Sequence, residues 1–273
     1  MRIDEALKEA SAQISSLCDN PARVAKILLM HHLGVSIEWV FLNLSKELQD
    51  KDEYFALIDR FASCEPLEYI TGKAGFYGLE FLVENGVLIP RPETEILVEK
   101  SLEILREFNA PKVCEIGVGS GIVSVCLALN SNALITATDI NEKALKLAHK
   151  NAVKFGVEKR INFIHCAYMD EACGEFDLVV SNPPYIADGY KLSKFVLNEP
   201  HEALFGGKNG DEILKNIILQ ARNRNIKNLV CEMGYDQKES MAKALEINKF
   251  EAKFYKDLAG FDRGFVAKFK YQI

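Results

Sequence analysis

Apolar residues in the first part of the chain recur at the spacing of a helix. The clearest run is Ile3, Leu7, Ala10, Ile14 and Leu17. Side chains three or four residues apart lie on one face of an α-helix, so this run predicts an amphipathic helix. Similar spacing continues to about residue 63, and we expect residues 1–64 to form a small helical bundle.

Polar residues, proline and glycine mark where these helices begin and end. Asn20-Pro21 predicts a helix start with proline at the first helical position, and Gly34 predicts the end of that helix. Ser36 is expected to cap a short third helix. Asp50, with Glu53 three residues later, is expected to form a capping box for a fourth helix.

After the bundle the pattern changes to short β-like runs. Two such runs, at 76–83 and 87–89, lie on either side of an Asn85-Gly86 turn. Alternating runs around an Asn-Gly pair are typical of a β-hairpin. We therefore expect residues 65–90 to be a β-hairpin linker.

Helices and strands alternate through the rest of the chain. Strands are predicted at 112–116, 134–139, 161–165, 176–181, 227–232, 251–256 and 264–270. Helices are predicted from about Pro92 to Phe108 and at 121–130, 141–155, 210–225 and 235–248. This alternation calls for a parallel sheet with helices on its faces.

The last two predicted strands have no helix between them. They are joined only through residues 257–262, so they should pair antiparallel. A parallel sheet that ends in such a hairpin is similar to the class I methyltransferase fold, a Rossmann-like α/β fold, and less like a dehydrogenase sheet. We expect residues 91–273 to form this domain.

Composition and charge argue against several classes of protein, namely nucleic-acid-binding, membrane-spanning, secreted and metal-binding proteins. The net charge of −6 gives no basic stripe of the kind that binds nucleic acid, so no direct nucleic-acid binding is expected. No apolar run approaches the ~20 residues of a membrane span, and the N-terminus lacks the plan of a signal peptide, so we expect a cytoplasmic protein. The seven cysteines are scattered without a close C-x-x-C pair, and no metal site is expected.

A glycine-rich turn follows the first strand of the predicted sheet. The segment 113–121 runs from a strand through Gly117, Gly119 and Gly121 into a helix. Glycines let the backbone approach a ligand and take positive φ. The dinucleotide fingerprint needs a glycine where Ile122 stands, so the spacing favours S-adenosylmethionine over NAD. A purely structural turn is the alternative interpretation.

Three further side chains are candidates for the same ligand. Asp139 ends the next strand, where a carboxylate can accept both ribose hydroxyls; alternatively it caps the following helix. Tyr168 is placed to stack on the adenine or to cover the sheet edge. Glu115 is expected either to hold the methionine amino group through water or to satisfy the amides of the turn.

The segment Ser181-Asn182-Pro183-Pro184-Tyr185 follows a buried strand and carries the candidate chemistry. An amide nitrogen is a poor nucleophile because its lone pair is delocalised into the carbonyl. Asn182 Oδ1 and the backbone carbonyl of Asn182 or Pro183 can accept both of its N–H bonds, while the prolines stiffen the turn. Tyr185 would pack against the planar target. We therefore predict catalytic roles for Asn182, Pro183 and Tyr185; the alternative is a structural proline turn.

Several segments together resemble the bacterial release-factor glutamine N5-methyltransferases (the HemK/PrmC family). The resemblance covers nearly the whole chain after residue 60. Its most specific segment is Ile89-Pro90-Arg91-Pro92-Glu93-Thr94-Glu95. The other segments are 65–72, 87–88, the glycine turn, 182–186, Glu199-Pro200 with Ala203-Leu204, and 256–260.

The resemblance implies an enzyme that methylates the glutamine in the Gly-Gly-Gln (GGQ) loop of peptide chain release factors, which would be its partners. It implies that the N-terminal bundle helps to hold the factor. The implied substrate-binding residues are Asn182, Pro183, Pro184 and Tyr185. Arg91, Pro92 and Thr94 are implied to line the glutamine pocket or to lie over the cofactor, and the alternative is that they only begin a helix. The cofactor positions that the resemblance implies are Gly117, Val118, Gly119, Ser120, Gly121, Asp139 and Tyr168. We also expect Glu115 and Asn182 to contact the cofactor.

The adenine contact and the overall function each have alternative interpretations. The family usually carries an acid before the aromatic residue that meets adenine, whereas this chain has Ala167 before Tyr168; Cys166 or a main-chain carbonyl could take over that contact. An N-methyltransferase for an exocyclic amino group of nucleic acid would also use the Asn182 turn, but it predicts basic patches. A non-catalytic adaptor would be favoured if that turn or the glycine turn were degraded.

Overall fold

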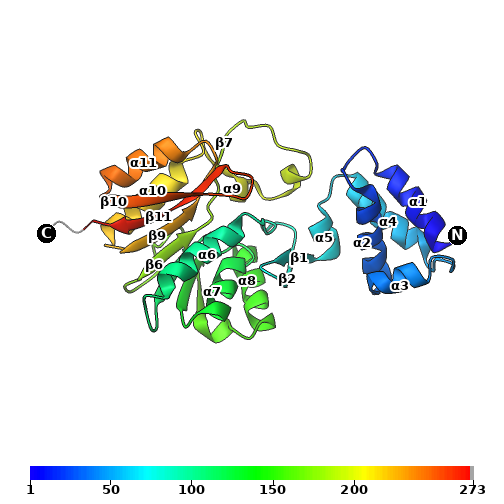
Figure 1. The fold of residues 1–273 in the computed structure, drawn as a ribbon, viewed down its shortest axis with the longest axis horizontal. Coiled ribbons are helices and arrows are strands. Elements are labelled where there is room, and N and C mark those ends of the chain that lie inside the picture. The colour runs from blue at the N-terminus through cyan, green and yellow to red at the C-terminus, as the bar shows by residue number, and fades with distance from the viewer. Residues whose placement is uncertain (271–273) are drawn as a thin grey trace. The chain divides into compact units, whose positions relative to one another are not determined.

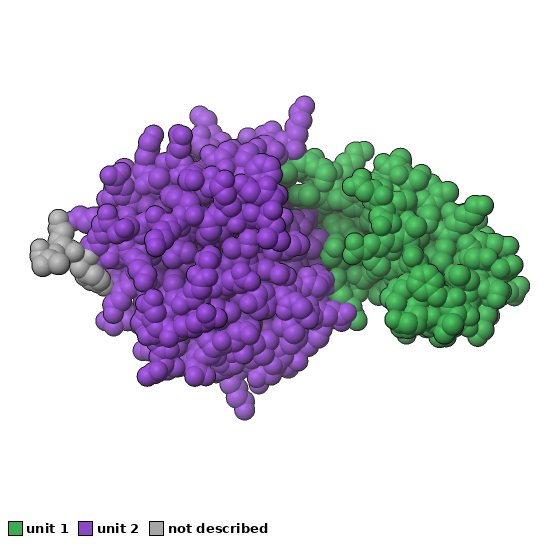
Figure 2. Space-filling model, viewed as in Figure 1, with its two compact units in different colours: residues 1–73, 192–198 green, residues 74–191, 199–273 purple. Residues whose placement is uncertain are grey.

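The chain divides into two compact units. The computed structural model describes residues 1–270, and Figure 2 shows the two units in different colours. The helical unit contains residues 1–73 and 192–198, and the sheet unit contains residues 74–191 and those from 199 onward. The short segment 192–198 therefore belongs to the helical unit although sheet-unit sequence surrounds it. The sequence-based boundaries at 64 and 90 remain predictions.

The helical unit is built from short amphipathic helices around one apolar core. They are α1 (Ile3–Gln13), α2 (Pro21–Leu33), α3 (Ile37–Leu42), α4 (Lys51–Ala62), α5 (Leu67–Thr71) and the 3₁₀ turn η2 (Val196–Asn198). The predicted caps of α2 and α3 are confirmed, because Asn20 Oδ1 accepts from the Arg23 amide at 3.0 Å and Ser36 Oγ from the Trp39 amide at 3.3 Å. Gly34 ends α2 in the left-handed conformation.

The predicted capping box at the start of α4 is wrong. Asp50 has a φ of 47°, and its side chain makes no cap hydrogen bond. A capping side chain reaches the first-turn amides from an extended backbone, which the left-handed Asp50 does not have. Its backbone carbonyl accepts from the Glu53 amide at 3.0 Å instead.

The β-hairpin linker is present, but its turn lies earlier than predicted. Strands β1 (Lys73–Phe76) and β2 (Leu79–Leu82) pair through a turn at Tyr77 and Gly78, whose φ values are 53° and 73°. Positive φ at both central residues matches the twist of a two-residue hairpin. The Asn85-Gly86 turn joins no strand pair, and the predicted strand at 87–89 is not formed.

The sheet unit has a seven-stranded sheet in the order β10-β11-β9-β6-β3-β4-β5. Its strands are β3 (Lys112–Ile116), β4 (Leu134–Asp139), β5 (Ile161–His165), β6 (Leu178–Ser181), β9 (Asn228–Glu232), β10 (Phe250–Lys256) and β11 (Asp262–Phe269). Strand β11 pairs antiparallel with both β9 and β10, and the other pairs are parallel. The predicted class I methyltransferase sheet with a terminal antiparallel hairpin is therefore confirmed.

Helices cover both faces of this sheet (Figure 1). Helices α6 (Thr94–Leu105), α7 (Ile122–Asn130) and α8 (Glu142–Lys154) pack on one face, and α10 (Glu212–Asn223) and α11 (Lys238–Ile247) pack on the other. The remaining elements are η1 (Glu158–Arg160), β7 (Ile186–Ala187), α9 (His201–Leu204) and β8 (Phe205–Gly207). In such a sheet, ligands bind at the carboxyl ends of the parallel strands.

Helix lengths bear on whether the chain crosses a membrane. The structure gives α2 and α8 13 residues each. A span needs about 20 apolar residues. Within residues 1–270, no helix combines the length and the apolar character that crossing a membrane requires.

Candidate active site

A cavity of about 260 Å³ lies at the carboxyl edge of the sheet. Its size is close to the lower end of the ~300–1,000 Å³ range of small-molecule sites, so it can take one small ligand. The two predicted turns meet in its wall: Gly117 and Gly119 follow β3, while Asn182, Pro183 and Pro184 follow β6. Strands β3 and β6 are parallel neighbours, which is why turns 65 residues apart reach the same edge.

The glycine turn combines an open backbone with a tight packing contact. Gly117 and Gly119 have φ values of 75° and 53°, and an added Cβ at either would meet no atom within 4 Å. At Gly121, with φ of 84°, an added Cβ would lie 2.9 Å from the Cα of Ala148 in α8. The first two glycines therefore leave room for a ligand, whereas Gly121 lets α7 and α8 approach closely.

Asp139 lies in the cavity wall at the end of β4. Its Oδ2 accepts from the Gly119 amide at 3.0 Å, and its Oδ1 accepts from the Asn141 amide at 2.9 Å. Burial raises the pKa of this carboxyl. The helix cap of α8 is Asn141, whose Oδ1 accepts from the Lys143 amide at 2.9 Å. Each carboxylate oxygen of Asp139 has a further lone pair, which can accept a hydrogen bond from a hydroxyl group of a ligand in the cavity.

Tyr168 also lines the cavity, together with Cys166 and Ala167. Its φ of 48° is unusual for a residue with a side chain. Its backbone carbonyl accepts from Thr138 Oγ1 at 2.5 Å, which holds this segment against the end of β4. The Tyr168 ring lies on a backbone segment that is held at the cavity, so it is suited to flank a planar group.

Part of the predicted cofactor set lies behind the cavity wall. Glu115 is 2% exposed, accepts a hydrogen bond from Ser124 Oγ, and does not line the cavity. Burial raises the pKa of Glu115 to about 8. Val118, Ser120 and Gly121 are also outside the lining set. The structure therefore brings together Gly117, Gly119, Asp139, Tyr168 and Asn182 at the cavity itself.

The Asn182 turn is fixed from two sides. Ser181 Oγ donates to the Ile116 carbonyl at 2.7 Å, which ties the end of β6 to β3. On the other side, an added Cβ on Gly206 would lie 2.5 Å from the Pro184 carbonyl oxygen, so β8 passes close to the turn. These contacts hold the backbone of the turn in place before any ligand binds.

Behind Asn182 lies a buried polar network. Asn182 Nδ2 donates to Thr94 Oγ1 at 2.9 Å, and Thr94 Oγ1 donates to Glu232 Oε2 at 2.8 Å. The Tyr185 hydroxyl donates to Glu232 Oε1 at 3.1 Å. Thr94 and Glu232 are each 1% exposed. Burial raises the pKa of Glu232 to about 7, and it also raises the pKa of the Tyr185 hydroxyl.

Two residues of the segment from Ile89 to Glu95 make side-chain contacts beside the cavity. Arg91 pairs with Glu199 Oε1 at 2.5 Å, and the Ile89 amide donates to Glu199 Oε2 at 3.0 Å. Thr94 reaches Asn182 as described above. Neither Arg91, Pro92 nor Thr94 lines the cavity, and neither does Tyr185. The segment therefore supports the wall of the cavity.

Sequence reasoning missed several wall residues. They are Gly86, Ile116, Thr138, Ile140, Asn141, Ala144, Glu202 and Ile213. It also missed Glu232 as part of the network. One signal was available for Glu232: it is a charged residue that directly follows three apolar residues and ends a strand at the edge where Asn182 stands.

The charge of the cavity indicates which ligands it suits. Asp139 and Glu202 are the charged residues among the described lining residues, and both are acidic. Most of the remaining lining is apolar or backbone. Such a wall favours a cationic ligand with hydroxyl groups and a planar apolar part over an anionic one.

Comparisons with known proteins agree with this geometry. A family model described as the PrmC N-terminal domain matches residues 5–72, and one described as the methyltransferase small domain matches residues 93–205. The release factor glutamine methyltransferase of Fusobacterium nucleatum is 37% identical over 262 residues, covering 91% of this chain and 73% of its own length. The protein of the same name from Coxiella burnetii is 33% identical over 277 residues, covering 98% and 99%.

Solved structures show the same fold at lower identity. A ribosomal protein L11 methylase from Lactobacillus delbrueckii subsp. bulgaricus superposes with a TM-score of 0.53 at 21% identity. It covers 69% of this chain and 84% of its own.

Proposed function

Since the chain belongs to the family of release factor glutamine methyltransferases, we propose that it transfers a methyl group from S-adenosylmethionine to the side-chain amide N5 of the glutamine in the GGQ motif of peptide chain release factors. One observation carries the proposal. The Asn182 turn, which suits a planar amide, shares one cavity wall with the glycine turn and Asp139, which suit a nucleoside.

The residues present fit S-adenosylmethionine. Gly117 and Gly119 leave the backbone open, Asp139 offers carboxylate lone pairs for the ribose, and Tyr168 can flank the adenine. The acidic lining suits the positive charge of the cofactor. When bound, the cofactor supplies an electrophilic methyl group on a sulfonium.

The chain's own part in the reaction is to orient the substrate amide. Asn182 Oδ1 and the backbone carbonyl of Asn182 or Pro183 can accept its two N–H bonds, which directs the nitrogen lone pair away from the turn. Because the prolines and the contacts of Ser181 fix the turn in advance, little reorganisation is needed at the moment of reaction.

No protein base is needed for the proton. An amide N–H becomes acidic only after the nitrogen has been methylated, and that proton can pass to water. The nearest ionisable side chain in the network, Glu232, is separated from Asn182 by Thr94. The rate therefore depends on positioning more than on acid–base catalysis.

The partner follows from the proposed substrate. We propose that the helical unit helps to hold the release factor and that the protein acts in the cytoplasm, where translation ends. The match of residues 5–72 to the PrmC N-terminal domain supports a shared role for this unit within the family.

A transfer assay tests the proposal. The protein is incubated with methyl-labelled S-adenosylmethionine and purified release factor, either wild type or with Gln→Ala in the GGQ motif, and in a parallel reaction with total RNA and DNA. The proposal predicts label in the wild-type factor only. Equal labelling of both factors, or label that enters only nucleic acid, would refute it.

A further inference from the structure

The orientation of the Asn182 side chain decides whether the turn can hold an amide. An asparagine amide presents an oxygen on one side and an NH₂ group on the other. A substrate amide nitrogen carries only N–H donors toward the turn. If the Asn182 NH₂ group faced the cavity, two donor groups would oppose each other. The proposed function therefore requires Asn182 Oδ1 to face the substrate.

The hydrogen atoms available in the buried network fix this orientation. An ionised Glu232 has no hydrogen to give, so it can only accept. Thr94 has a single hydroxyl hydrogen, which goes to Glu232 Oε2. Thr94 Oγ1 can then only accept from Asn182, and the group of Asn182 that faces it must be the NH₂. Oδ1 is left for the cavity.

A proton on Glu232 would reverse the same chain of bonds. A neutral Glu232 can donate to Thr94 Oγ1, and Thr94 would then donate to Asn182. Asn182 would have to turn Oδ1 toward Thr94 and present its NH₂ group to the substrate. Each polar group of the network would still have a hydrogen-bond partner, so the reversal does not require the side chains to repack.

We propose that Thr94 and Glu232 are positioning residues, which act through Asn182 to keep its oxygen directed at the substrate amide and do not touch the substrate themselves. The inference rests on the proposed function for the identity of the substrate. The side chain of Tyr185 is fixed by the same carboxylate, since its hydroxyl donates to Glu232 Oε1 at 3.1 Å.

The groups around Glu232 come from three parts of the sheet unit. Helix α6 and the residue before it contribute Thr94 and Glu93, the turn contributes Tyr185, and the terminal hairpin contributes Arg263 and Tyr255. Burial raises the Glu232 pKa to about 7, while Thr94, Tyr185 and Arg263 oppose the rise and Glu93 adds to it. Arg263 also pairs with Asp257 at 2.8 Å.

The ionised form of Glu232 is the one that keeps Asn182 Oδ1 toward the substrate. Therefore kcat should fall as the pH drops below the Glu232 pKa of about 7.

The first test changes the hydroxyl of Thr94. Thr94→Val keeps the shape but removes the hydroxyl group that orients Asn182, so we expect kcat for release factor to fall about 10- to 100-fold. The cofactor Kd should stay close to that of the wild type, and the melting temperature should fall by only a few degrees, because Glu232 Oε2 and Asn182 Nδ2 each lose one hydrogen-bond partner. Thr94→Ser restores the hydroxyl and should recover most of kcat. Thr136→Val in β4 is the matched control for the same chemical change away from the network. Wild-type kcat in Thr94→Val would contradict the proposal.

The second test separates a positioning role from a structural one. The acid limb of the kcat–pH profile between about pH 6 and 8 should be present in the wild type and in Thr94→Ser. It should be absent in Glu232→Gln, because that side chain does not titrate. An acid limb that persists unchanged in Glu232→Gln would overturn the role of Glu232.

A readout without substrate distinguishes this inference from the proposed function. With nitrogen-15 labelling, the side-chain NH₂ signals of Asn182 should shift with pH in the wild-type protein and stay constant in Glu232→Gln. Signals that do not titrate in the wild type contradict the inference even if release factor is methylated. Titrating signals in a protein that fails to methylate release factor would instead contradict only the proposed substrate.

Discussion

Asn182 is the residue on which the amide chemistry depends most directly. We expect Asn182→Ala to lower kcat about 100- to 1,000-fold, since it removes an acceptor used chiefly in the transition state. The Kd for S-adenosylmethionine should change only a few-fold, because Gly117, Gly119, Asp139 and Tyr168 remain. Kinetics and calorimetry on the same preparation measure both quantities. A loss of cofactor binding equal to the loss of kcat would speak against this role.

Glu115 makes folding stability depend on pH. Its pKa is raised from an ordinary 4.5 to about 8, with burial as the main cause, so the folded state holds a proton that the unfolded state has released. The free energy of unfolding should therefore fall as the pH rises from about 4.5 to 8, by an amount on the order of a few kcal/mol. Denaturant unfolding without ligand should show a flatter dependence in Glu115→Gln. An identical slope in both proteins would mean that Glu115 does not stay protonated in the fold.

Single functional residues can be predicted from the sequence where they stand in a recognisable local pattern. Asp139 and the Asn182 turn could be predicted because Asp139 ends a strand and Asn182 directly follows one. The network behind Asn182 could not be assigned, because Thr94 and Glu232 are 138 positions apart and no local pattern joins them. The resemblance implies that Thr94 contacts the substrate or the cofactor, and this role remains a prediction. In the structure Thr94 instead contacts Asn182 and Glu232.

Among the elements, the approach of α7 to α8 depends on one glycine. Gly121→Ala would place a Cβ 2.9 Å from the Cα of Ala148 at a φ of 84°. Backbone strain and overpacking together should lower the free energy of unfolding by about 2–4 kcal/mol and the melting temperature by roughly 5 °C or more. Gly117→Ala is the control, since it has positive φ but open space, and it should cost only about 1 kcal/mol. Equal losses in both variants would show that the contact with α8 is unimportant.

The strands of the sheet were easier to predict than the hairpin. Each of β3 to β6 and β9 to β11 is a continuous apolar or alternating run, and the predicted bounds agree within a few residues. The hairpin was misplaced because Asn85-Gly86 is the stronger turn signal in sequence, whereas Tyr77 takes positive φ without the glycine or asparagine usual there. Elements as short as α5, β7 and β8 are held by tertiary contacts and leave little local pattern.

For the whole molecule, the segment 192–198 links two stretches of sheet-unit sequence through the helical unit. Within that unit the ring of Phe195 lies 4.9 Å from the ring of Phe61, and Asn198 Nδ2 donates to the Cys64 carbonyl at 2.9 Å. Sequence patterns could not assign this segment, because it has no periodicity and its partners are more than 100 positions away.

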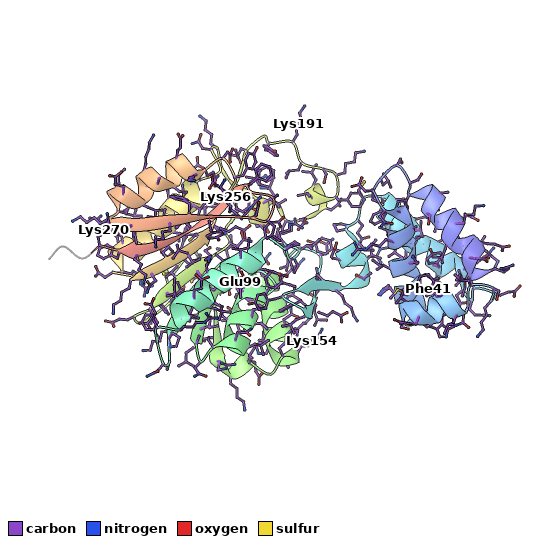
Figure 3. The ribbon with its side chains drawn as sticks, viewed as in Figure 1. Phe41, Glu99, Lys154, Lys191, Lys256 and Lys270 are labelled. Atoms are coloured by element: carbon purple, nitrogen blue, oxygen red, sulfur yellow. The ribbon has the colours of Figure 1, made fainter. Side chains whose placement is uncertain are left out.

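Truncating the ring of Phe195 tests how firmly this segment is held. Phe195→Ala should cost about 1–3 kcal/mol of stability in the helical unit and speed hydrogen exchange in α4. Phe41→Ala is the control, because Phe41 is 57% exposed and its side chain is labelled in Figure 3. Exchange that is unchanged in α4 for Phe195→Ala would indicate that the segment contributes nothing to the unit.

We expect the enzyme to methylate the side-chain nitrogen of one glutamine. Release factor in which that glutamine carries a nitrogen-15 side-chain amide is incubated with the protein and S-adenosylmethionine, and its digested GGQ peptide is fragmented in a mass spectrometer. We expect one added methyl group, released together with the labelled nitrogen as methylamine, and methylation about 100- to 1,000-fold slower with Asn182→Ala. A methyl group on the backbone or on another residue, or an unmodified peptide with the wild-type protein, would contradict it.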